Sequence, residues 1–260
     1  MDSQILAWTL ESVNKDARKP SVEGDMSSRA IERPKADYVG VGLYTPAEAA
    51  VYARLQTQML NRWLFPEREG AEVIEAQLGK AERIVTFRDF VQALAIRAIR
   101  RHHGISLQKI REAVDRAERD FGVRYPLARK HRAYLLGKQI IIRVGDGDAG
   151  PLVQVTGKKS GHLMLREVVE VFMKHLSWDA DGFACQYECY SYGDRRFTMN
   201  PQVHFGEPVL NTHPYSVRAI LGALETEGTV EAAAKALGVE PADVEAAVAY
   251  DDYLQAPIAA

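Results

Sequence analysis

Apolar residues recur at spacings of three and four along much of the chain, a pattern that predicts helices joined by short polar turns. The first helix has the clearest start, because Thr45 can cap it, Pro46 suits the first helical position and Glu48 completes a capping box. Ser106 and Thr229 are caps of the same kind. The pattern predicts helices over residues 46–53, 56–64, 87–101, 106–122, 163–176, 217–224, 230–237 and 241–253.

Alternating or β-branched segments occupy the middle of the chain. Residues 133–136 and 139–144 flank Gly137-Lys138, which predicts a hairpin, and residues 183–190 and 196–199 predict two further strands. Ile84-Val85 would form a short wing strand beside the helices. The expected fold class is mainly α with small β elements, that is, α+β.

Composition shifts divide the 260-residue chain. Residues 1–36 are polar and predict a flexible arm, within which Met26 is a possible natural start. Residues 37–135 predict a winged helix-turn-helix domain, residues 136–192 a β-containing connector, and residues 193–260 a C-terminal helix-turn-helix domain.

Composition narrows the class of protein. No apolar run approaches the roughly 18 residues that a membrane span needs, and the polar start lacks the features of a secretory signal. Cys185 and Cys189 are the only cysteines, so a disulfide scaffold is excluded. We therefore expect a cytoplasmic protein with no membrane partner.

Charge is distributed unevenly. Residues 83–132 hold 13 basic and 5 acidic side chains, whereas residues 216–260 hold 2 basic and 8 acidic ones. A basic block and an acidic tail in a chain of net charge −2 indicate two faces with different partners.

The second of the first two predicted helices presents amide, hydroxyl and guanidinium groups. Such groups are suited to base edges and phosphates in the major groove. The basic block that follows would neutralise backbone phosphates beside it. The predicted DNA-binding residues are Gln56, Thr57, Gln58, Asn61, Arg62, Arg97, Arg100, Arg101, Lys109 and Arg111.

The segment TPAEAAVYARLQTQMLNRWL, residues 45–64, resembles the MerR/excisionase type of helix-turn-helix without a gap. It departs from that pattern at the turn, where Arg54 replaces the usual Gly and Gln56 replaces the usual Ser or Thr cap. A non-Gly residue at positive φ costs about 1 kcal/mol. A helical hairpin that only packs is the alternative interpretation.

Residues 229–250 form a second helix-turn-helix candidate of opposite charge. Glu240, Asp243 and Glu245 would lie on its exposed face, where phosphate repulsion opposes entry into a groove. This motif is therefore expected to contact protein.

The C-terminal segment TMNPQVHFGEPVLNTHPYSV and the helices after it are similar to the antitoxin-associated domain of unknown function number 433. Joined to a MerR-like N-terminus, this domain resembles a VapB-type antitoxin. The resemblance implies repression of its own operon as a homodimer and neutralisation of a VapC-type PIN-domain toxin, which is a ribonuclease. Asn211-Thr212-His213-Pro214 departs from the Gly-Thr-Arg-Ile portion of the family pattern.

A PIN-type site is a cluster of metal-binding carboxylates, so its inhibitor should offer arginine or an apolar plug. Arg195, Arg196 and Phe197 are the predicted toxin-binding residues, with Arg29 and Arg33 of the arm as alternatives. Dimerisation would use the C-terminal helices or the apolar stripe of residues 165–172.

Motifs for catalysis and for cofactor or metal binding are lacking. The chain has no phosphate-binding Gly-rich loop, nucleophile elbow or His-Glu-x-x-His pair. We expect no catalytic residue, no metal and no cofactor. Two alternatives stay open: a stand-alone MerR-like regulator that senses a small ligand in the β-rich middle, and an enzyme whose Cys and His residues bind metal.

Overall fold

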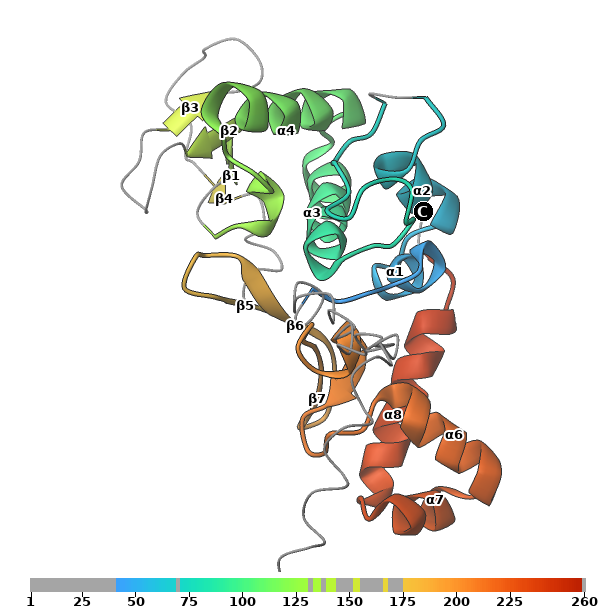
Figure 1. Cartoon of the computed structure of the whole chain (residues 1–260). Coiled ribbons are helices and arrows are strands. Elements are labelled where there is room, and N and C mark those ends of the chain that lie inside the picture. The colour runs from blue at the N-terminus through green and yellow to red at the C-terminus, as the bar shows by residue number, and fades with distance from the viewer. Residues whose placement is uncertain are drawn as a thin grey trace, which may run out of the picture. The chain divides into compact units, whose positions relative to one another are not determined.

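A computed structural model describes residues 41–68, 71–130, 133–136, 139–143, 152–154, 166–167 and 175–258 (Figure 1). The chain divides into a unit of Met1–Ala36 and a compact unit of Asp37–Ala260. The predicted arm, its possible start at Met26, and Arg29 and Arg33 lie outside the described residues. The three domains predicted within the larger unit stay predictions.

The first predicted helix pair forms as expected. Helix α1 spans Pro46–Tyr52 and begins with the capping box of Thr45 and Glu48, and helix α2 spans Thr57–Leu64. The core of this helix pair holds five buried side chains: Ala49, Ala50, Leu55, Leu60 and Trp63.

Helix α3 (Phe87–His103) packs at the centre of the larger core. Thr86 and Asp89 form its capping box, and Gly104 ends it in the left-handed conformation. The sequence predicts one buried stripe, but α3 is buried around most of its circumference. Helix α4 (Leu107–Phe121), capped by Ser106, follows it and leads to the 3-10 turn η1 (Pro126–Ala128).

The first sheet is antiparallel with strand order β3-β2-β1-β4. Its strands are β1 (Ala133–Leu136), β2 (Gln139–Arg143), β3 (Leu152–Gln154) and β4 (Arg166–Glu167). The predicted hairpin is confirmed by the pairing of Leu136 with Gln139. The helix predicted over residues 163–176 is contradicted where the structure describes that range, because Arg166–Glu167 form β4 and Leu176 begins another strand, and the rest of the range lies outside the described residues. The stripe proposed there for dimerisation lies outside the described residues.

The second sheet has strand order β5-β6-β7-β8 and is also antiparallel. Its strands are β5 (Leu176–Trp178), β6 (Ala184–Tyr192), β7 (Arg195–Met199) and β8 (Pro208–Leu210), with the 3-10 turn η2 (His204–Gly206) before the last. The expected wing is reduced to one bridge between Tyr44 and Val85.

Three helices complete the chain and pack together beside β6 and β8 (Figure 1). They are α6 (Val217–Glu227), α7 (Val230–Leu237) and α8 (Pro241–Gln255). Thr229 caps α7 as predicted. Their apolar faces surround Phe197 and form a second core. The α+β fold class is thus confirmed, and among the described residues no helix could cross a membrane.

Tyr44 and Gly206 join the segment before α1 to the turn before β8. The Tyr44 hydroxyl donates to the Gly206 carbonyl oxygen at 2.8 Å, and the Leu43 N–H donates to the Phe205 carbonyl at 3.0 Å. Gly206 has a φ of +95°, and a Cβ there would lie 2.0 Å from the tyrosine oxygen. Only glycine therefore permits this close approach.

Asp89 is a fully buried carboxyl. It accepts the backbone N–H groups of Thr86 at 3.1 Å and Gln77 at 3.2 Å. Burial raises the pKa of Asp89 from 3.8 to about 6, although these hydrogen bonds and the charge of Arg88 act in the opposite direction. Between about pH 4 and pH 6, the folded protein therefore keeps a proton on Asp89 that the unfolded chain has already released.

This titration predicts that stability falls as pH rises from about 4 to about 6, because the native state binds more protons over that window. The Asp89→Asn variant lacks the titration. We expect the unfolding free energy of the wild type, relative to Asp89→Asn, to fall by roughly 2 kcal/mol between pH 4 and pH 7, as measured by urea unfolding. Asp120→Asn, which changes an exposed carboxyl on α4, should keep the wild-type profile. Parallel pH profiles for the wild type and Asp89→Asn would contradict the assignment.

Candidate nucleic-acid interface

Helix α2 separates into a buried and an exposed face. Leu60, Trp63 and Leu64 face the core, whereas most of the predicted DNA-binding side chains of this helix are solvent-exposed. The exposed ones are Gln56, Thr57, Gln58 and Arg62. Asn61 is half-buried, and its side-chain oxygen accepts from Arg83 at 2.9 Å. Four of the five predicted groups are therefore free to meet a ligand.

The turn between α1 and α2 contains both residues that depart from the MerR/excisionase pattern, Arg54 and Gln56. Arg54 adopts a φ of +51°, so an arginine occupies a left-handed position that favours glycine. Gln56 is the N-cap of α2 and makes no side-chain capping bond. The turn forms in spite of both replacements.

The Arg54 side chain provides a reason for the replacement. Its Nη1 donates to the carbonyl oxygens of Tyr253, Leu254 at 2.8 Å and Ala256 at 2.8 Å, and its Nη2 donates to Pro257 at 3.2 Å. The guanidinium also lies 4.8 Å from the Tyr253 ring centroid. Arg54 thus places a positive charge at the C-terminal end of α8, where the helix dipole favours a cation.

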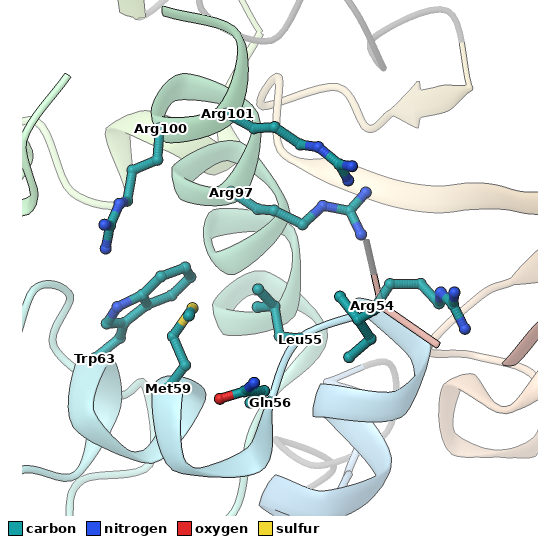
Figure 2. Close-up of a pocket in the computed structure, with 9 residues that line it drawn as sticks. Arg54, Leu55, Gln56, Met59, Trp63, Arg97, Arg100 and Arg101 are labelled. Carbon is teal, nitrogen blue, oxygen red and sulfur yellow. The ribbon is translucent and has the colours of Figure 1, made fainter. Parts of the chain in front are cut away.

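A pocket of about 480 Å³ lies between the start of α2 and one face of α3 (Figure 2). Met59 and Trp63 of α2 point toward α3, and arginines of α3 extend over the same space. We call it the arginine pocket and define it by its lining residues: Arg54, Leu55, Gln56, Met59, Trp63, Arg97, Arg100, Arg101 and Ile258. Four predicted DNA-binding residues, Gln56, Arg97, Arg100 and Arg101, meet here.

The three α3 arginines of this pocket differ in environment. Arg100 and Arg101 are exposed, whereas Arg97 is partly buried and donates to the Ala53 carbonyl oxygen. Burial lowers the pKa of Arg97, and the charges of Arg101 and Arg54 lower it further. Arg97 therefore fastens α3 to the end of α1, and Arg100 and Arg101 are the accessible charges.

Helix α4 offers one exposed cation for DNA, whereas its sequence predicts two. Lys109 is exposed, but Arg111 donates to the carbonyl oxygens of Glu72 at 2.8 Å and Ala71 at 2.5 Å. Arg111 thus holds the segment after α2 against α4. The structure does not bring either residue into the arginine pocket.

The predicted toxin-binding residues lie on β7, where one is buried and another is held by ion pairs. Phe197 is fully buried, which leaves it no surface to offer to a toxin. Arg195 is 16% exposed and pairs with the buried Asp243 at 3.1 Å and with Glu240. Arg196 is more exposed, although its Nη1 donates to the Gly193 carbonyl at 2.7 Å.

Helices α7 and α8, the second predicted helix-turn-helix, carry acidic side chains on their surface as expected, with one exception. Glu240 and Glu245 are exposed, but Asp243 is 1% exposed, so its placement on the exposed face was wrong. It is a capping residue of α8 that also accepts the Thr212 hydroxyl at 3.1 Å. The spacing alone cannot separate a capping Asp from a surface Asp.

Cys185 and Cys189 lie on β6 as free thiols. Across the described part of the chain, no group of three or more His, Cys, Asp or Glu side chains is arranged to hold a metal. Burial raises the pKa of Cys189 to about 12, so this thiol is unreactive at neutral pH.

Two arginines join segments that are distant in the sequence, and the sequence alone does not predict their partners. Arg54 stands out in the sequence only as a departure from the usual glycine. Arg218 of α6 lies 3.0 Å from Glu48 of α1 and 3.2 Å from Glu207, and nothing in its local pattern points to these partners. Both contacts form between segments that are far apart in the sequence, so they depend on the tertiary fold and cannot be recognised from a local pattern.

Known proteins resemble the C-terminal part of this chain and, in one case, most of its length. The family described as "Protein of unknown function (DUF433)" matches residues 198–250, from β7 into α8. A candidate antitoxin of Mycobacterium tuberculosis, VapB45, is 28% identical over 220 residues, which cover 77% of this chain and 90% of that protein.

The fold also has a counterpart among solved structures. The crystal structure of Rv2018 from Mycobacterium tuberculosis aligns with a TM-score of 0.53 at 20% identity, covering 80% of this chain and 98% of that one. The chain is thus antitoxin-like in sequence over most of its length, and its fold is shared with a solved mycobacterial protein.

Replacing Arg54 by glycine should separate the effect of its strained backbone from the effect of its contacts with the end of α8. Arg54→Gly relieves the positive-φ strain but removes the donors at the end of α8, so we expect faster amide exchange over residues 251–258. Arg83→Gly is the matched control, because Arg83 also has positive φ and contacts only α2 and Phe65 in the described structure. Hydrogen–deuterium exchange read by mass spectrometry measures both. Equal protection of residues 251–258 in Arg54→Gly and wild type would show that the guanidinium contacts do not stabilise this end.

Proposed function

We propose that this chain is the antitoxin of a type II toxin–antitoxin system, which binds operator DNA and neutralises a VapC-type PIN-domain ribonuclease. The observation that carries the proposal is the similarity to the candidate antitoxin VapB45 along 90% of that protein's length. The DUF433 match in the C-terminal part supports the same class.

DNA binding would use the MerR-like helix pair. In this proposal α2 enters the major groove and presents Gln58 and Arg62 to base edges, since glutamine pairs with adenine and arginine with guanine or phosphate. Arg100, Arg101 and Lys109 are exposed cations that would contact the flanking phosphates. A homodimer would place two such helices on a palindromic operator.

The salt dependence of binding tests the DNA half. If four to six phosphates are contacted, the slope of log affinity against log salt should be about −4 to −5 for DNA from upstream of the gene. Arg62→Gln should weaken binding and reduce the magnitude of the slope by about 1 if Arg62 contacts a phosphate. Gln58→Ala should relax the preference for one base pair, as read by fluorescence anisotropy on single-base operator variants.

Arg119→Gln is the matched control for these variants, because Arg119 is exposed on α4 outside the predicted interface. It should leave affinity and slope unchanged. An affinity that does not respond to salt would refute DNA binding by this face.

Toxin neutralisation would depend on the exposed part of β7. Arg196 is the predicted toxin-binding residue on β7 with accessible surface, whereas replacing Arg195 would remove the guanidinium from the buried Asp243 and leave only His213 beside that carboxylate among its ion-pair partners in the described structure. Arg196→Ala is therefore the informative variant, and an Arg195 variant would confuse inhibition with folding.

A native pull-down of the tagged full chain tests this half. We expect a small co-eluting protein, identified by mass, whose ribonuclease activity appears once the complex is separated. Arg196→Ala should inhibit this nuclease at least tenfold more weakly, with Arg124→Ala as a control on another exposed arginine. A chain that elutes alone would instead favour a stand-alone regulator.

A further inference from the structure

The arginine pocket combines two features that phosphate contact alone does not explain. One side is apolar, formed by Leu55, Met59 and the ring of Trp63, and the opposite side is formed by guanidinium groups (Figure 2). A DNA phosphate needs an exposed cation but no hydrophobic wall behind it. A volume of about 480 Å³ lies within the range of small-molecule sites.

The charges around this space are unbalanced. No carboxylate is among the lining residues, and within the described structure none of the four arginines forms an ion pair. Arg54 and Arg97 are held by backbone carbonyls, so their positions are fixed by the fold. Like charges held this close repel each other, and an anion between them would relieve that repulsion.

The remaining two arginines are able to move onto a ligand. Arg100 and Arg101 are exposed and have no hydrogen-bond partner in the described structure, so their planar donor groups are free. A guanidinium matches a carboxylate or a phosphate with two parallel hydrogen bonds. Ile258, which is 43% exposed, adds an apolar rim from the C-terminal tail.

We propose that the arginine pocket binds a small organic anion, which has a carboxylate or phosphate group on a flat hydrophobic body. The anionic group would lie between Arg100 and Arg101, and the hydrophobic body would pack mainly on Met59 and Ile258, because Trp63 is only 1% exposed. The site shares Arg100 and Arg101 with the phosphate contacts proposed for DNA, so an anion bound here would compete with an operator. The pocket itself supports the inference, which is tested without DNA and holds whether or not the chain binds an operator.

The test is calorimetric titration of the full chain, without DNA, using 2-naphthoate, 2-naphthyl phosphate and the neutral 2-naphthamide. We expect one molecule of either anion to bind per chain, and the amide to bind at least tenfold more weakly. The stronger of the two anions identifies which acidic group the site prefers.

The decisive variant is Arg100→Gln/Arg101→Gln, which should lose at least tenfold in affinity for the anions. Arg116→Gln/Arg119→Gln removes the same charge from exposed positions on α4 and should bind like the wild type. Circular dichroism confirms that each variant is folded.

Three results would overturn the proposal: no saturable binding of either anion, equal affinity for the neutral amide, or equal loss of affinity in both double variants. The last would mean that the chain attracts anions through its overall charge. Failure of operator binding in a separate assay would leave this inference in place.

Discussion

The end of helix α8 needs hydrogen-bond donors, and Arg54 supplies them from the turn between α1 and α2. The last carbonyl groups of any helix lack partners within the helix and carry its partial negative charge. Here they are satisfied by a residue about 200 positions earlier in the chain. The contact ties the strained turn at Arg54 to the C-terminal tail, and Arg54 and Ile258 of these two segments both line the arginine pocket.

Local chemistry explains what the sequence predicts well. Helices that start at Thr45, Thr86, Ser106 and Thr229 begin where expected because a capping side chain acts within three residues of itself. The helix predicted over residues 163–176 gives way to strands at residues 166–167 and 176, because apolar spacing in a short segment does not separate a helix from strands that pair with distant partners. The burial of Phe197, Arg195 and Asp243 likewise depends on long-range packing of β7 against the C-terminal helices.

In the basic block, residues 83–132, the number of basic side chains is larger than the number that is exposed to a ligand. Several of its arginines serve the fold: Arg97 and Arg111 donate to backbone carbonyls, and Arg88 lies 4.1 Å from the Phe183 ring centroid. Arg100 and Arg101 remain exposed beside α2. The sequence identifies a basic region correctly, but only tertiary contacts show which guanidinium groups are free to meet a ligand.

The contact of Arg54 with α8 also bears on how this protein can be divided or recombined. The family match ends at residue 250, inside α8, and the partners of Arg54 lie just beyond it. A fragment cut at that limit would lose the last turn of α8 and leave Arg54 strained without its acceptors. The α1–α2 turn and the end of α8 are therefore coupled through this side chain: a chimera or recombinant that keeps these contacts has to inherit Arg54 together with the residues after position 250.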